Sequence, residues 1–426
     1  MMHLNPSIAA LLNGLNNLSL PGIDLSLVRM RELMKALGNP EKKIPPVIHL
    51  AGTNGKGSTL AFLRDIYQVT GYRVHAYTSP HLVSFNERIT IAGHEVSDDY
   101  LLDLLQRITD AAKTIPATFF EATTAAAFLA FSENSADMVL LETGLGGRLD
   151  ATNVVERPIA TIITPVDYDH MEFLGNTLGD IAAEKAGIMK YGAPCFMGSQ
   201  KPEAREVLKR AARTAGCELI QFGREWDYTA NEKTIDVLFG TSSWNLSHPA
   251  LPGAHQFHNA ALASVVALSL PQLPVTLDGV TKAIAATHWP ARLQRLTHGP
   301  LVDVWNGEVY LDGGHNPGAA EALRSWLDER AEPVTLLCGM MKRKDVQGFL
   351  KPIAAKISRF IAVPIEGNDS FAPEQLAATA QAAGIVDVRT SRSLMDATAT
   401  LQTAAKGTLL IAGSLFLAGE VLKNHS

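Results

Sequence analysis

The feature that most constrains the fold is the alternation of apolar strands with amphipathic helices along almost the whole chain. In the first half, strands are expected at Val47–Ala51, Val74–Thr78, Met138–Leu141 and Ile159–Thr164. Segments with the leucine spacing of helices lie between them, one of them capped by Ser97. Apolar strands between helices are buried on both faces, so this pattern predicts an α/β protein with a mostly parallel sheet covered on both sides.

A second alternating series follows the sequence His288-Trp289-Pro290. Its strands are expected at residues 309–312, 334–337, 360–363 and 409–412. Before it, the polar, β-like stretch Trp226–Leu246 predicts an antiparallel flap or an added sheet edge. Alanine-rich helices are then expected at residues 258–270 and 277–287. The 426 residues therefore divide into a larger domain over 1–288, a linker over 289–300 and a smaller domain over 301–426.

Composition excludes several classes of protein. The 37 basic and 43 acidic residues give a net charge of −6, which argues against a general nucleic-acid binder. The three cysteines, Cys195, Cys217 and Cys338, are too far apart for a disulfide framework or a zinc site. Residues 1–12 lack the basic start of a signal peptide, and no apolar run is long enough to cross a bilayer. We expect a cytoplasmic protein that binds neither nucleic acid nor membrane.

A glycine-rich loop joins the first strand to a helix over about residues 58–70. Its sequence is Gly52-Thr53-Asn54-Gly55-Lys56-Gly57-Ser58-Thr59. Glycines let several backbone N–H groups point inward, and a helix N-terminus adds partial positive charge, so the loop predicts a phosphate-binding site. Lys56 would reach the β- and γ-phosphates, and the hydroxyl of Ser58 or Thr59 would hold Mg²⁺. Counted back from Gly55-Lys56, the first glycine of a standard P-loop would fall at Leu50, so the spacing of this loop departs from the standard motif. The alternative to a phosphate-binding loop is an ordinary tight turn between a strand and a helix.

Three further side chains stand where the site of an α/β protein would form. Glu142 ends a strand and precedes a glycine-rich loop, so it is a candidate Mg²⁺ ligand. His170 also follows a strand, and a second divalent ion there, Mn²⁺ as well as Mg²⁺, would suit a histidine better than Mg²⁺ alone. Lys185 lies late in a helix opened by Thr177, but its ammonium would be repelled by two cations. Taken alone, each has an ordinary alternative: a solvated acid, a loop histidine and a surface ion-pair partner.

Together these segments resemble the Mur ligase superfamily and, within it, the bifunctional bacterial type of folylpolyglutamate synthase/dihydrofolate synthase. The matching stretches follow the family order from residue 52 to residue 317. They are residues 52–58, 79–82 (Ser-Pro-His-Leu), 85–89 (Phe-Asn-Glu-Arg-Ile), 119–121 (Phe-Phe-Glu), 142–153, 169–170, 184–188 (Glu-Lys-Ala-Gly-Ile), 251–256 (Leu-Pro-Gly-Ala-His-Gln), 289–293 (Trp-Pro-Ala-Arg-Leu) and 312–317 (Asp-Gly-Gly-His-Asn-Pro).

The resemblance implies an ATP-dependent ligase that adds L-glutamate to dihydropteroate, to reduced folates, or to both, through an acyl phosphate. It implies a P-loop central domain with a mostly parallel sheet and a smaller, Rossmann-like C-terminal domain that closes over it. It also implies two divalent metal sites. We expect the protein to be a monomer. Ala291 stands where many members of the family have glycine, and Gly313-Gly314 replaces a more apolar pair.

The resemblance also implies a role for each matching residue. Loop residues 52–59 would bind the ATP phosphates, with Lys56 as a catalytic residue. Asn259 would read the adenine, and Arg292, Asp312 and His315 would reach ATP from the linker and the second domain, with Arg292 also catalytic. One metal would be held by Ser58 and Glu142. The other would be held by the catalytic residues His170 and Lys185, since the family carbamylates this lysine and a carbamate attracts a cation. Residues lining the pteroate pocket would be Phe120, Asp150 and Ala151.

Three alternatives remain from the sequence. A cell-wall precursor ligase of the same superfamily would need a UDP-sugar-binding domain before the P-loop, and only about fifty residues precede it here. A P-loop kinase would leave Lys185 and the 312–315 segment without a role. A nucleotide-controlled binding module would bind ATP without turnover.

Overall fold

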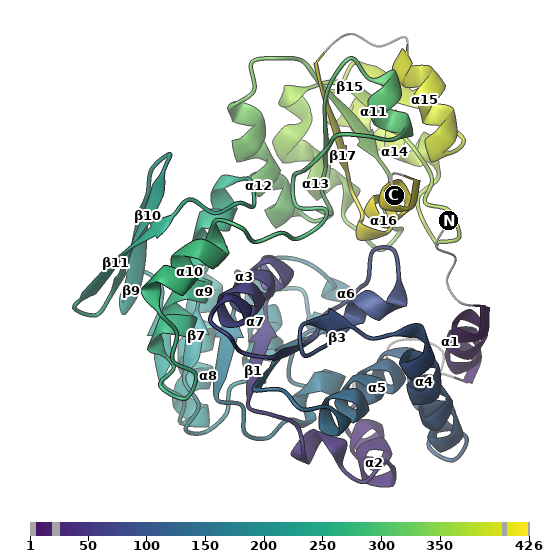
Figure 1. The fold of residues 1–426 in the computed structure, drawn as a ribbon. Coiled ribbons are helices and arrows are strands. Elements are labelled where there is room, and N and C mark those ends of the chain that lie inside the picture. The colour runs from purple at the N-terminus through teal and green to yellow at the C-terminus, as the bar shows by residue number, and fades with distance from the viewer. Residues whose placement is uncertain (1–5, 19–25, 403–406, 425–426) are drawn as a thin grey trace.

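The chain forms two α/β domains that lie one above the other, as seen in a computed structural model that describes residues 6–18, 26–402 and 407–424 (Figure 1). Residues 1–12 are expected not to be a signal peptide, and the first five of them lie outside the described residues. A helix begins at Pro6. None of the helices within the described ranges has the length and apolar character needed to cross a membrane.

The larger domain is built on one eight-stranded sheet with the strand order β4-β3-β2-β5-β1-β6-β7-β8. Its strands are β1 (Val47–Ala51), β2 (Val74–Tyr77), β3 (Ile89–Ile91), β4 (His94–Glu95), β5 (Met138–Glu142), β6 (Ala160–Ile163), β7 (Cys195–Met197) and β8 (Leu219–Gln221). Neighbouring strands pair in parallel along the series β2, β5, β1, β6, β7 and β8. Strands β3 and β4 add an antiparallel hairpin at the β2 edge. The prediction of a mostly parallel sheet is confirmed.

Helices cover both faces of this sheet. They are α1 (Pro6–Leu18), α2 (Val28–Ala36), α3 (Lys56–Val69), α4 (Asp98–Ala112), α5 (Phe119–Glu133), α6 (Met171–Leu174), α7 (Leu178–Ala186), α8 (Pro202–Ala215), α9 (Ala254–Ser269) and α10 (Leu277–Ile284), with short 3₁₀ helices at Pro40–Lys42, Phe85–Arg88 and Ala151–Val154. Ile48 and Leu50 pack with α3, α9 and α10 on one face, whereas Val47 packs with α1, α2, α4 and α5 on the other. The alternation along β1 therefore divides the core into two layers.

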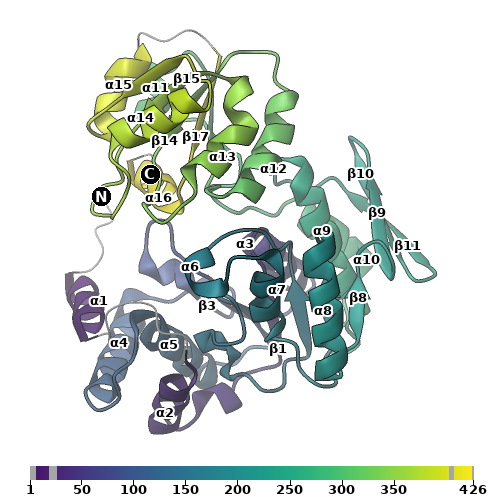
Figure 2. The ribbon, with the colours of Figure 1, turned by 180° about the vertical axis from the view of Figure 1, so that it is seen from behind.

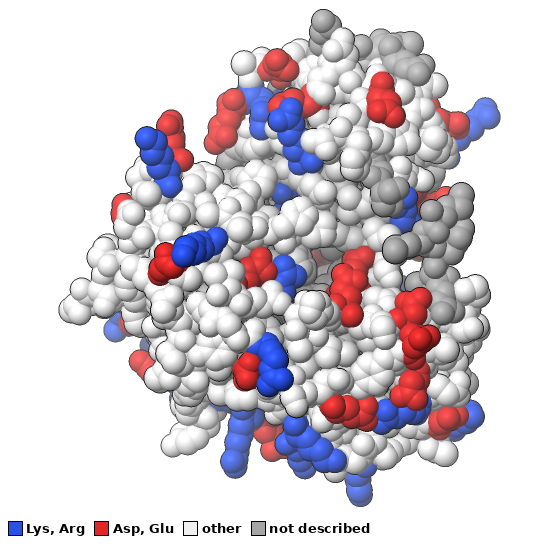
Figure 3. Space-filling model, viewed as in Figure 1, with Lys and Arg blue, Asp and Glu red and all other residues white. Residues whose placement is uncertain are grey.

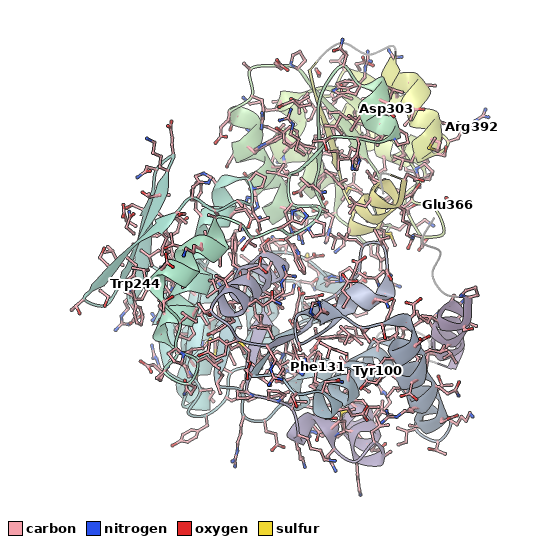
Figure 4. The ribbon with its side chains drawn as sticks, viewed as in Figure 1. Tyr100, Phe131, Trp244, Asp303, Glu366 and Arg392 are labelled. Atoms are coloured by element: carbon pink, nitrogen blue, oxygen red, sulfur yellow. The ribbon has the colours of Figure 1, made fainter. Side chains whose placement is uncertain are left out.

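The stretch predicted as a flap forms a separate three-stranded antiparallel sheet. Its strands are β9 (Trp226–Ala230), β10 (Thr234–Phe239) and β11 (Ser242–Ser247). The sheet projects from one side of the molecule, and Trp244 lies on it (Figure 4). After it, α9 begins a full turn earlier than the predicted start at His258 because Gly253, with φ 101°, lets the chain turn directly into the helix.

The smaller domain has a six-stranded sheet with the order β12-β13-β17-β14-β15-β16, parallel except for β12. Figure 2 shows its strands β14, β15 and β17 between the helices of this domain. Its strands are β12 (Gln294–Leu296), β13 (Gly307–Leu311), β14 (Val334–Cys338), β15 (Ile357–Ala362), β16 (Asp387–Thr390) and β17 (Gly407–Ala412). Its helices are α11 (Pro300–Val304), α12 (Pro317–Asp328), α13 (Val346–Ile353), α14 (Pro373–Ala382), α15 (Leu394–Gln402) and α16 (Leu415–Asn424), with a 3₁₀ helix at Ala354–Lys356. This sheet already begins at β12, inside the predicted linker over 289–300.

The order of the central strands positions the candidate site. Because β1 lies between β5 and β6, the carboxyl ends of these three strands, at Ala51, Glu142 and Ile163, lie side by side. Loops that follow the carboxyl ends of parallel strands form the ligand sites of open α/β sheets. The glycine-rich loop follows β1 there.

Candidate active site

A cavity of about 510 Å³ lies where the two domains meet, and both domains contribute to its lining. Side chains from the two domains crowd the space between the ribbons in Figure 4. On the face drawn in Figure 3, acidic side chains form a column on the lower right of the molecule, and basic and acidic side chains are mixed elsewhere. Most of the predicted site residues line the cavity: Gly52, Thr53, Asn54, Gly55, Lys56, Gly57, Ser58, Glu142, His170, Lys185, Asn259, Arg292, Asp312 and His315.

The glycine-rich loop is held rigidly against the segment that follows β6. The backbone N–H groups of Thr53 and Asn54 both donate to Pro165 O, at 3.0 and 3.2 Å. The Thr53 hydroxyl donates to Asp167 O and accepts from Asp167 N, both at 3.0 Å. The side chain of Thr53 is therefore committed to the loop's own structure, which leaves the later backbone N–H groups at the start of α3 for an anion.

Two lysines converge on one carbonyl group of this loop. Lys56 Nζ donates to Gly52 O at 3.1 Å, and Lys185 Nζ, on α7, donates to the same oxygen at 3.0 Å. Burial, followed by the charge of Lys56, lowers the pKa of Lys185 to about 7. A substantial share of Lys185 is therefore neutral near pH 7, whereas an ordinary lysine is neutral in only about one part in 3,000.

Glu142 places a buried carboxylate beside the loop. Its Oε1 lies 3.9 Å from Lys56 Nζ, and its other oxygen accepts from Ser79 N at 3.4 Å. Burial raises the pKa of Glu142, while Lys56 opposes that shift. The carboxylate has few protein donors, so it keeps lone pairs for a hard cation.

His170 stands at the start of α6 in the left-handed conformation, with φ 52°. Its Nε2 lies 3.5 Å from Lys344 Nζ and 3.8 Å from Asp169 Oδ1. The surrounding protein lowers the pKa of His170 although 42% of its side chain is exposed, so the imidazole is neutral at pH 7, as a metal ligand must be. Burial alone would raise the pKa of Asp169, but His315 and Lys344 hold it well below its usual range.

A chain of polar side chains runs from the loop onto α9. Gln256 Nε2 donates to Ser58 Oγ at 3.3 Å, and Asn259 Nδ2 donates to Gln256 Oε1 at 2.9 Å. Asn259 Oδ1 lies 2.6 Å from where a Cβ on Gly55 would stand, so only glycine fits there. Thr59, the alternative hydroxyl, is fully buried and is not among the described residues that line the cavity.

The linker brings Arg292 into the cavity on strained backbone. Ala291 and Leu293, on either side of it, both have positive φ, at 54° and 45°. Asp312 holds this conformation because its carboxylate accepts from Leu293 N at 2.9 Å and from Gly314 N at 2.7 Å. Non-glycine residues in this region cost about 1–2 kcal/mol each, and such strain is concentrated at functional sites.

The three residues predicted to line a pteroate pocket lie next to the cavity rather than in its lining. Phe120 lies with Cζ only 2.2 Å from where a Cβ on Gly144 would stand, so its ring covers the glycine loop after β5. Asp150 is buried and accepts from Leu145 N at 2.7 Å and from Thr152 N at 3.0 Å. Ala151 is buried beside it. The Asp150 carboxylate therefore shapes the 144–150 loop, and a substrate role for the three residues stays a prediction.

Sequence reasoning missed several residues that line the cavity or reach into it from the second domain. His255 had a signal, since it stands four residues before Asn259, the spacing of one helix face. Burial lowers the pKa of His255, and its Nδ1 lacks a hydrogen-bond partner among the described residues. Asn316 exchanges two hydrogen bonds with Asn54, at 3.2 and 3.0 Å. Lys344 gave no local signal, because it contacts the site only through the fold.

Known protein families and solved structures match this chain over most of its length. The family model described as Mur ligase middle domain matches residues 50–267, and the model described as dihydrofolate synthetase, C-terminal domain, matches residues 300–424. A dihydrofolate synthase/folylpolyglutamate synthase of Bacillus subtilis is 35% identical over 78% of this chain and 79% of its own. The Escherichia coli FolC structure with DHPP and ADP has a TM-score of 0.88 and 32% identity over 98% of this chain and 97% of its own. A bifunctional enzyme solved with Mn, AMPPNP and L-glutamate has a TM-score of 0.86 and 30% identity over 98% of this chain and 97% of its own.

Proposed function

The chain belongs to the dihydrofolate synthase/folylpolyglutamate synthase family of Mur ligases, and on that premise we propose how its residues carry out the reaction. It is an ATP-dependent ligase of folate metabolism that uses a divalent metal ion and forms an amide with L-glutamate. This activity takes the place of two alternatives that the sequence left open, a P-loop kinase and a nucleotide-controlled binding module. We propose that this chain accepts dihydropteroate, reduced folates, or both.

The P-loop backbone and Lys56 would bind the β- and γ-phosphates. Lys56 now bonds to the carbonyl of Gly52, so it would exchange that neutral acceptor for a phosphate oxygen, which is a stronger partner. Asn259 would read the adenine, and Arg292, Asp312 and His315 would approach ATP from the linker and second domain. Asp312 also fixes the backbone around Arg292, which lines the cavity with the domains in contact as they are here, so closure would hold this guanidinium against the phosphates.

The residues present fit two divalent ions. Ser58 and Glu142 offer the hydroxyl and carboxylate oxygens that Mg²⁺ prefers, and His170 offers a neutral imidazole, which suits Mn²⁺ better. Such ions would neutralise phosphate charge as the γ-phosphoryl group moves to the substrate carboxylate. Lys185 would complete the second site as a carbamate, which forms when its neutral amine adds to CO₂ with loss of one proton.

The observation that carries this proposal is the convergence on one cavity of the P-loop, a buried acid, a buried lysine of low pKa and a histidine, with Arg292 between the domains. A carboxylate held there would become an acyl phosphate, and the amine of glutamate would then displace phosphate. The substrate carboxylate and the phosphates of ATP are both anions and repel each other, and the cationic side chains would hold them together.

The proposal is tested by ADP release from the purified protein with ATP, Mg²⁺ and L-glutamate, comparing dihydropteroate and tetrahydrofolate as acceptors. We expect glutamate-dependent release with at least one acceptor, and amide product in equal amount. Activity with both would make the chain bifunctional. If neither acceptor stimulates ADP release, the proposed substrates are wrong.

Phe120→Ala is expected to raise the KM for the pteridine acceptor about tenfold and to leave the KM for ATP within about twofold, because an aromatic ring that covers the glycine loop supplies stacking area for a flat ring system. Steady-state kinetics with each substrate varied in turn measures both constants. Tyr191→Ala is the matched control, since that ring is 89% exposed. Equal losses for both substrates would remove Phe120 from the pocket.

We further propose that residues 1–288 and 301–426 act as the two domains about a linker over 289–300, within which β12 extends the second sheet. We propose a cytoplasmic monomer that binds neither nucleic acid nor membrane. Three free, buried cysteines support a reducing compartment.

A further inference from the structure

The loop after β14 reaches across from the smaller domain to the segment that carries His170. Lys344 Nζ donates to Asp169 Oδ1 at 2.7 Å, and the two side chains are only 13% and 12% exposed. The neighbouring Arg343 lies 3.5 Å from Glu172, but these side chains are 64% and 44% exposed. Exposed ion pairs contribute little, so Lys344 is the stronger of the two links.

The position of His170 depends on Asp169. The backbone N–H of His170 donates to Asp169 Oδ1 at 2.9 Å, and that oxygen also accepts from Lys344. The other oxygen of Asp169 accepts from Asn316 Nδ2 at 3.1 Å and lies 3.3 Å from His315 Nε2. Side chains of the smaller domain thus contact both oxygens of the carboxylate that holds the backbone of His170.

The His170 segment has little support of its own. The helix that follows it, α6, has four residues, and His170 itself has the unfavourable φ of 52°. A short helix with a strained first residue keeps its conformation only where its surroundings hold it. Here the surroundings include the other domain.

We propose that Lys344 is a positioning residue that couples domain closure to metal binding: in the closed form it fixes Asp169 and, through it, the direction of the His170 imidazole. The inference rests on the proposed function, because it takes His170 as a metal ligand. By linkage, a metal bound at His170 would favour closure as much as closure favours the metal.

The test compares Lys344→Met, Lys344→Arg and Lys342→Met in the full chain with AMPPNP. Lys342 is the matched control, since it lies in the same loop but is 54% exposed and pairs with Asp369. Mn²⁺ binding is measured from the free-ion EPR signal, the order of residues 169–174 by amide hydrogen exchange, and turnover by kcat and KM for glutamate. Groups that orient metal ligands typically affect affinity 10–100-fold.

We expect Lys344→Met to weaken one Mn²⁺ site at least tenfold, to speed exchange over 169–174 and to lower kcat, with the KM for glutamate unchanged. Lys344→Arg should keep most of the wild-type Mn²⁺ affinity, exchange protection and kcat. Lys342→Met should match the wild type in all three quantities within about twofold. Unchanged Mn²⁺ affinity and exchange with a raised KM for glutamate would overturn the proposal and make Lys344 a substrate ligand. His170→Ala tests the premise separately: if it binds Mn²⁺ as the wild type does, the metal assignment itself fails.

Discussion

Lys185→Ala is expected to abolish turnover almost completely, with kcat lowered by at least about 10²–10³-fold, while ADP and AMPPNP still bind with nearly wild-type affinity. Alanine removes the amine that would become the carbamate, and with it one ligand of the second metal. The amine contacts the loop only through Gly52 O, which Lys56 also reaches, so the loop itself should survive. Steady-state kinetics and calorimetric nucleotide binding measure the two quantities.

The low pKa of Lys185 adds a pH dependence to this prediction. Only the neutral amine reacts with CO₂, so carbamate formation should rise with pH through about 7 and level off above it. Recovery of activity after removal and return of bicarbonate, at several pH values, would follow this curve. Lys209→Ala is the matched control, because that lysine pairs with Glu206 on the outside of α8. Full activity of Lys185→Ala would show that the lysine is structural.

Long, locally patterned features could be predicted from the sequence. β1, β5 and β6 are buried at every position and consist mostly of apolar residues because both of their faces are covered, and this pattern is visible in the chain. β7 and β8 have three residues each, too few for any period to appear. The start of α9 was misplaced because Gly253, rather than a polar cap, begins it.

The residues of the candidate site likewise include some that local motifs predict and some that only the fold brings together. The residues that motifs mark lie within one loop or one strand end, so their neighbours in sequence are also their neighbours in space. Lys344 and Asn316 reach Asp169 and Asn54 across 175 and 262 positions of the chain, and no local spacing records such a contact. Only the packing of two domains brings them together, so these two contacts could not be found from the sequence alone.

Gly52→Ala is expected to weaken nucleotide binding at least about 100-fold and to lower stability by about 1–3 kcal/mol. Gly52 has φ 149°, and a Cβ there would lie 1.8 Å from Thr164 Oγ1. Thr164 has no room to give way, because it is fully buried and its backbone N–H donates to Ala51 O at 2.9 Å. The loop would have to move instead, and Gly52 O would move away from both lysines. Calorimetric ADP binding and thermal unfolding measure the two effects.

A second glycine separates backbone strain from this steric effect. Gly71 also has positive φ, at 96°, but a Cβ there would meet no described atom within 4 Å. Gly71→Ala should therefore cost about 1–2 kcal/mol of stability through strain alone and leave ADP binding unchanged. If Gly52→Ala bound ADP as Gly71→Ala does, the contact with Thr164 would not shape the phosphate site. The expected contrast means that Gly52 serves as the first glycine of this P-loop, although standard spacing assigns that place to Leu50, which lies fully buried inside β1.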